Sequence, residues 1–119
     1  MSTDESLKAL IVTIQRSLPL EIRTAPPSGE YLEGVLLRDA LPQLCELLAG
    51  ALGRPTKDFE QKVSLSKDIQ AMVNAIGGIR DDQCLFLKIS TNKPIGYAML
   101  WPWASDPQRV TIKVGVFSS

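Results

Sequence analysis

Residues 83–117, QCLFLKISTNKPIGYAMLWPWASDPQRVTIKVGVF, decide the fold, because they predict three consecutive strands joined by short turns. The first strand, 83–90, is apolar on both faces, so we expect it to lie in the centre of a sheet. The second, 95–103, ends at Pro102, which cannot donate a hydrogen bond to a sheet ladder. The third, 109–117, alternates apolar and polar residues, as a strand with one buried face does.

The preceding part of the chain predicts three helices and two extended segments. Each helix has an apolar stripe at the i, i+3, i+4 spacing. We expect Asp39 to cap the second helix and Ser66 the third, which Gly77-Gly78 then ends. Gly34 predicts a bulge or a close backbone approach. The predicted elements are a helix over 5–18, an extended piece over 20–24, a strand over 31–38, a helix over 39–52 and a helix between Ser66 and Gly77.

Together these elements predict an α/β chain of the α+β kind. A mixed, largely antiparallel sheet of four or five strands would be packed by two or three helices. The 119 residues suit one domain, in which 1–30 supply a helix and an extended segment and 31–119 supply the rest. A strand as regular as 109–117 needs a neighbour on each side, since otherwise it forms an edge that pairs with other chains.

Composition and charge exclude several classes of function. Thirteen Lys and Arg balance thirteen Asp and Glu, so no basic face for nucleic acid is expected. The sequence holds no histidine, which removes Ser-His-Asp catalysis, Cys-His catalysis and His-ligated zinc. No apolar run approaches the roughly 20 residues of a membrane span. We therefore expect no catalytic residue, no metal site, no nucleic-acid partner and no membrane partner.

The two cysteines, Cys45 and Cys84, each lie in an apolar run, which predicts small core residues rather than a disulfide or reactive thiols. The opening residues, Met-Ser-Thr-Asp-Glu-Ser, are polar and acidic, unlike a secretion signal. Free thiols without such a signal predict a cytoplasmic location.

Three runs carry a family resemblance: VLLRDALPQLCELLAGALG (35–53), DDQCLFLKISTNKPIGYAMLWPW (81–103) and VTIKVGVF (110–117). In this order they resemble the N-terminal half of the GNAT superfamily of N-acyltransferases, over residues 34–117. The first run is similar to that superfamily's first strand and helix, where an arginine ends the strand and an aspartate opens the helix. The other two are similar to its second, third and fourth strands.

The resemblance implies acetyl-CoA as cofactor, but the sequence lacks the parts that bind it. In the superfamily, the fourth strand leads into a glycine-rich turn whose N–H groups hold the pyrophosphate, and here the sequence ends before that turn. The frequent glutamate base is also missing, because Thr111 and Lys113 fill the polar positions. The backbone of Lys113, Val114 and Gly115 would remain for acetyl-CoA or for another strand. Residues 5–24, or a second chain, would have to replace the missing elements.

Tyr97, Trp101 and Trp103 lie at i, i+4 and i+6, so a regular strand places them on one face. They predict either a ligand or partner surface or a set of core residues that brace the sheet. Our leading expectation is a non-catalytic, soluble interaction module that self-associates as a homodimer, through strand 109–117 or the 97–103 aromatic face. The alternative is a GNAT-like acyltransferase, or an acyl-CoA or small-ligand-binding protein, completed by a second subunit.

Overall fold

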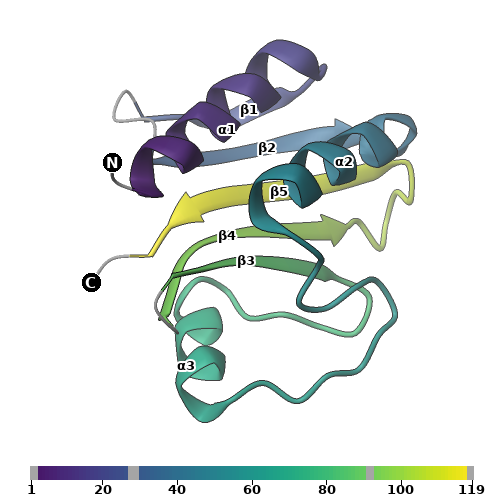
Figure 1. Ribbon diagram of the computed structural model, residues 1–119. Helices are drawn as coiled ribbons and strands as arrows, with labels where there is room; N and C mark the ends of the chain where they lie inside the picture. Colours follow the sequence, from purple (N-terminus) through teal and green to yellow (C-terminus); the bar gives the residue numbers. More distant parts are fainter. Residues whose placement is uncertain (1–2, 27–29, 91–92, 118–119) are drawn as a thin grey trace.

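The computed structural model describes residues 3–26, 30–90 and 93–117 (Figure 1). Within these residues the α+β class is confirmed, with a five-stranded antiparallel sheet and three α-helices. None of the helices in this part of the chain is long and apolar enough to cross a membrane. In chain order the elements are α1 (Thr3–Ser17), β1 (Glu21–Thr24), β2 (Tyr31–Leu37), a 3-10 turn (Arg38–Ala40), α2 (Leu41–Leu52), α3 (Lys67–Ala75), β3 (Cys84–Ser90), β4 (Lys93–Pro102) and β5 (Arg109–Val116).

The strands lie in the order β1-β2-β5-β4-β3, and all neighbours are antiparallel (Figure 1). The last strand, β5, is central: Val114 pairs with Leu32 of β2 on one side and with Ala98 of β4 on the other. The prediction that strand 109–117 offers an edge to another chain is therefore wrong. Both hydrogen-bonding sides of β5 are occupied within the chain.

The strand expected to be central, β3, lies instead at an edge of the sheet. The strand is apolar on both faces because helices pack against both of its faces. Phe86 packs in the cluster formed with α1 and α2, whereas Leu85 and Leu87 pack in the cluster formed with α3. Burial on both faces thus requires a layer above and below the strand, and it does not require a strand on each side.

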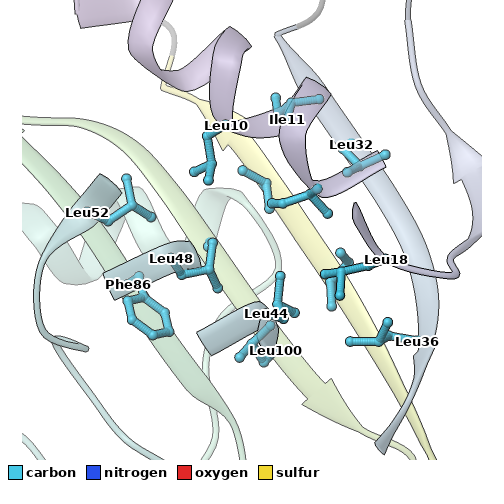
Figure 2. Packing of buried hydrophobic residues seen from close by; sticks show 14 of the residues in the cluster. Leu10, Ile11, Leu18, Leu32, Leu36, Leu44, Leu48, Leu52, Phe86 and Leu100 are labelled. Atoms are coloured by element: carbon cyan, nitrogen blue, oxygen red, sulfur yellow. The ribbon is translucent and has the colours of Figure 1, made fainter. Parts of the chain in front are cut away.

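The main core lies between the sheet and the two helices α1 and α2, which cover one face (Figure 2). Val110, Ile112 and Val114 of β5 all point into it and are fully buried, as their alternation predicts. Each such side chain stabilises the fold by roughly 1.5–3 kcal/mol. Figure 2 labels ten members of this core: Leu10, Ile11, Leu18, Leu32, Leu36, Leu44, Leu48, Leu52, Phe86 and Leu100.

The opposite face of the sheet, called here the α3 face, carries a smaller cluster. Val73, the buried side chain of α3, packs there with Leu85, Leu87, Tyr97 and Met99. These residues belong to β3 and β4, so α3 packs mainly on that side of the sheet and reaches β5 only near its end. Over β1, β2 and the first half of β5, no residue of α3 lines the cavity on this face.

The predicted ends of α3 are confirmed. The backbone N–H of Ile69 donates to the hydroxyl of Ser66 at 3.3 Å, which makes Ser66 the cap. Gly77 and Gly78 follow the helix with positive φ angles of 119° and 77°, which glycine adopts without strain. The cap residue and the glycine pair both lie next to the helix in the sequence, so the helix ends can be predicted from the sequence alone.

The prediction that Asp39 caps the second helix is wrong. The chain first forms a 3-10 turn over Arg38–Ala40, and α2 begins at Leu41 with Ala40 in the cap position and no side-chain cap bond. Asp39 lies inside that turn, whereas a capping residue needs an extended backbone. Gly34, in contrast, meets its prediction, since a Cβ there would lie 3.0 Å from the carbonyl oxygen of Glu21.

The outer edge of β3 is partly closed by the segment that joins α2 to α3. The N–H groups of Thr56 and Lys57 donate to the carbonyl of Leu85 at 2.8 and 3.1 Å, and Leu85 donates back to Lys57 at 2.8 Å. The Lys57 side chain is only 3% exposed. Its Nζ donates to three backbone carbonyls, those of Asp58, Asp81 and Gln83, at 3.1, 2.7 and 2.7 Å.

Candidate binding face

Tyr97, Trp101 and Trp103 lie on the α3 face, so their predicted common orientation is confirmed. Their environments differ. Tyr97 is buried beside α3, and Trp101 packs at the margin of the same cluster. Trp103 follows β4, is half-buried, and lies over Thr111 of β5. The three residues therefore span the covered and the uncovered parts of one face.

Trp103 forms one wall of a polar cavity of about 240 Å³ on the uncovered part, called here the Trp103 pocket. Its indole N–H donates to the Thr111 hydroxyl at 2.7 Å, which fixes the ring plane. The guanidinium of Arg109 lies 5.6 Å from the ring centroid and pairs with Asp106 at 3.1 Å. The pocket is lined by Arg23, Glu33, Val35, Trp103 and Thr111.

Trp101 packs against residues of the chain itself, namely Lys113 and Gly77. The ammonium of Lys113 lies 4.0 Å from the centroid of its ring, a favourable cation–π geometry. Gly77, just after α3, also lies close to this ring, because a Cβ there would be 2.9 Å from Trp101 Cη2 and 3.8 Å from the Lys113 ammonium. Its indole nitrogen is buried and has no hydrogen-bond partner among the described residues. The core-bracing interpretation of the aromatic residues therefore holds best for Trp101.

A second, more apolar cavity of about 410 Å³, called here the α3 groove, lies between α3 and the end of β5. The rings of Tyr97 and Phe117 both line it, with centroids 4.9 Å apart and planes tilted by 48°. Burial, and then the negative charge of Glu33, raise the pKa of the Tyr97 hydroxyl. The groove is lined by Met72, Ala75, Ile76, Tyr97, Val116 and Phe117.

Tyr31 holds Glu33, a lining residue of the Trp103 pocket, through a hydrogen bond. Its hydroxyl donates to the Glu33 carboxylate at 2.7 Å, and its ring lies against Gly115, where a Cβ would come within 3.1 Å of Tyr31 Cδ1. Burial, followed by the hydrogen bond to Glu33, raises the pKa of Tyr31 well above its ordinary value. The hydroxyl therefore stays protonated and the carboxylate accepts. This fixed pair presents a negative group beside Arg23.

Lys113, Val114 and Gly115 do not offer free backbone groups to acetyl-CoA or to another strand. In register, they pair with Glu33, Leu32 and Tyr31 on one side of β5 and with Met99, Ala98 and Tyr97 on the other. The expected pairing of these residues with a further strand is therefore wrong, whereas their contact with acetyl-CoA stays a prediction. The place beside β5 is taken by β2, while β1, which lies within residues 5–24, pairs with β2 on its far side.

Neither cysteine thiol is activated by its surroundings. Burial, and next the charge of Asp58, raise the pKa of the Cys84 thiol to about 12 and also raise the pKa of Cys45. Neutral thiols are poor nucleophiles and poor metal ligands. Within the described ranges, no three His, Cys, Asp or Glu side chains come together as a possible metal site.

Three lining residues of the Trp103 pocket, namely Arg23, Glu33 and Thr111, were not singled out for it from the sequence. Each belongs to a different strand, and they meet only because β1, β2 and β5 are neighbours. The available signal was the alternation of Tyr31, Glu33 and Val35 along β2, which puts all three on one face. The alternation predicts which residues share a face. It does not predict the pocket, because that also requires the order of the strands in the sheet.

Comparison of the chain with models of known families, with characterised proteins and with solved structures gave no match. The resemblance to the GNAT superfamily therefore stays a prediction from the quoted runs alone.

Proposed function

We propose that the chain is a non-catalytic interaction module that binds a polypeptide segment across the uncovered part of the α3 face and that self-associates. The observation that carries the proposal is the Trp103 pocket, in which a fixed indole, a cation and a carboxylate line one cavity on the part of the face outside the α3 cluster. Tryptophan and arginine are the side chains most enriched at the energetic centre of protein interfaces.

The small volume of the Trp103 pocket and its distance from the α3 groove favour a polypeptide over a cofactor. The Trp103 pocket, at about 240 Å³, is smaller than the roughly 300–1,000 Å³ sites that enclose small ligands, and it suits a single side chain. Thr111 in the pocket and Phe117, which follows β5 and lines the α3 groove, are six residue steps apart, which is about 20 Å in an extended chain. A peptide spans that distance readily.

The chemistry of the linings defines the bound segment. The pocket presents Arg23 and Glu33, so it accepts a polar or charged side chain that can pair with one of them. The α3 groove presents Met72, Ile76 and Phe117, so it accepts an apolar side chain. The segment would therefore carry one polar and one apolar anchor about 20 Å apart.

Selection from a displayed random-peptide library tests this function. Enriched peptides should bind the purified protein, and Arg23→Gln or Trp103→Ala should weaken that binding by at least about tenfold. Arg16→Gln is the matched control, because Arg16 is an exposed arginine on α1, on the opposite side of the sheet. Far-ultraviolet circular dichroism of each variant verifies folding. The proposal fails if no peptide is enriched, or if the pocket variants bind like the wild type.

The acyl-CoA alternative is tested in the same preparation by thermal melting. Acetyl-CoA at 100 times its dissociation constant would add about 2.7 kcal/mol to the stability of a protein that binds it. We expect no shift, because β5 has no unpaired backbone in its central residues. A clear rise in the melting temperature would favour the acyltransferase reading instead.

A further inference from the structure

The strand β1 forms the other edge of the sheet, and its outer side has no paired strand among the described residues. All four of its residues are exposed, and the side chain of Ile22 is 48% exposed. The opposite edge, β3, is partly closed by the bridge from Thr56 and Lys57 to Leu85. The sheet therefore offers β1 as its more accessible edge for strand pairing.

The sequence of β1, Glu-Ile-Arg-Thr, is complementary to itself in one antiparallel register. When Ile22 lies opposite Ile22 of a second copy, Glu21 of each copy lies opposite Arg23 of the other. Two opposite-charge pairs then flank one apolar pair, and both kinds of cross-strand pair are stabilising. Glu21 and Arg23 are both about half exposed, so they are free to make these contacts.

The ion pairs that β1 makes within one copy are weak, so they do not oppose pairing with a second copy. Within one copy, Glu21 lies 3.9 Å from Arg23 and 3.7 Å from Arg109, distances that mark loose surface ion pairs. The whole chain carries no net charge, so two copies approach without overall repulsion. A second copy therefore gains charge pairs at β1 without losing strong ones.

We propose that two copies of the chain associate through antiparallel pairing of β1 with β1, in the register that centres on Ile22, to give a continuous ten-stranded sheet. This rests on the self-association included in the proposed function, and it names the surface and the partner. Because Arg23 lines the Trp103 pocket, the pairing brings the two pockets to one face on either side of the symmetry axis. A two-fold related pair of pockets suits a partner that presents two similar segments.

Charge reversal tests the register. In sedimentation equilibrium at protein concentrations up to about 200 µM, we expect the wild type to dimerise and Glu21→Arg or Arg23→Glu alone to weaken dimerisation at least about tenfold, because each places like charges opposite each other. Mixing these two variants should restore a dimer, since every cross-strand pair is then of opposite charge. The double variant E21R/R23E should also dimerise by itself.

Ile22→Lys and Ile89→Lys form a matched pair. Ile89 lies on β3, at the other edge, and is 51% exposed. Only the Ile22 variant should lose the dimer. If the wild type dimerises but the β1 variants dimerise equally well, the β1 surface is wrong and self-association stands. If the wild type stays monomeric over the whole concentration range, both the β1 dimer and the proposed self-association are overturned, while peptide binding at the Trp103 pocket is judged separately.

Discussion

Lys57 is the one buried charged side chain among the described residues, and three backbone carbonyls surround its ammonium group. Two of these carbonyls belong to the turn before β3 and one to the segment after α2. The side chain thus ties two loops together from inside, at the edge of the sheet. A hydrogen bond from a charged donor contributes roughly 1.5–3 kcal/mol, more than a neutral one.

We expect Lys57→Met to lower the free energy of unfolding by about 3 kcal/mol, because three carbonyls lose a charged donor at a buried site. Lys62→Met is the control, since Lys62 is 84% exposed and pairs only loosely with Asp81 at 3.8 Å. Its effect should stay within about 0.5 kcal/mol. Urea unfolding of both variants measures the difference, and equal losses would contradict the structural role of Lys57.

Stability should fall in alkaline solution. Burial raises the pKa of the Cys84 thiol from an ordinary 9.0 to about 12, and the pKa values of Tyr31 and Tyr97 are raised as well. Between those two pH values the unfolded chain loses the Cys84 proton and the folded chain keeps it. The stabilisation is therefore complete below pH 9.0 and decreases as the pH rises toward 12.

For Cys84 alone, the slope of this decrease is roughly 1.4 kcal/mol per pH unit. Urea unfolding at a series of alkaline pH values measures it. The variant Cys84→Ala should show a shallower slope, although its stability at neutral pH is lower because it leaves a small cavity. An identical slope in the two proteins would mean that the thiol does not titrate differently in the folded and unfolded states.

At the scale of the element, β5 is the strand on which the sheet depends, because it joins the β1-β2 pair to the β4-β3 pair. Val114 is fully buried on its helix-covered side. We expect Val114→Lys to cost at least about 4 kcal/mol, since an unpaired ammonium would enter an apolar core, and the protein should not fold.

Lys113→Met, one residue away on the other side of β5, should cost only about 1 kcal/mol, from the lost contact with Trp101. Circular dichroism and thermal melting distinguish the two variants. A Val114→Lys protein as stable as the wild type would contradict the position of β5 at the centre of the sheet.

The elements themselves could be predicted from sequence because their signals are local. Ser66 and the Gly77-Gly78 pair mark the ends of α3 within a few residues of the helix, and the alternation along 109–117 marks a strand with one core face. The Asp39 prediction was wrong because Asp39 lies inside a 3-10 turn that precedes α2, and the sequence pattern did not indicate that turn. Strand order could not be predicted, because it depends on which distant strands pair.

For the candidate site too, the sequence predicts the local arrangement and does not predict the contacts between distant strands. Period-two spacing was enough to put Tyr97, Trp101 and Trp103 on one face. The spacing did not distinguish the structural Trp101 from Trp103, which lines the pocket with Arg23 and Glu33. That difference arises from α3 and from the neighbours β1 and β2, which lie far from β4 in the sequence.

At the scale of the whole molecule, the uneven covering of the sheet follows from one long connection. After α2 the chain runs from one face to the other around the edge of β3, and it reaches α3 before it enters the sheet again (Figure 1). α3 therefore lies close to β3 and β4, while no residue of α3 lines the cavity over β1, β2 and the first half of β5. The proposed binding face is a consequence of this path.

The central position of β5 also has a consequence for the newly made chain on the ribosome. The β1-β2 pair and the β3-β4 pair can each form early, but neither has the strand that joins them until Arg109–Val116 have emerged. Up to that moment β2 and β4 each present an unsatisfied row of N–H and C=O groups, the kind of surface that aggregates. The sheet can therefore close only after β5 has been synthesised, and until then the two strand pairs expose edges to aggregation or to a chaperone.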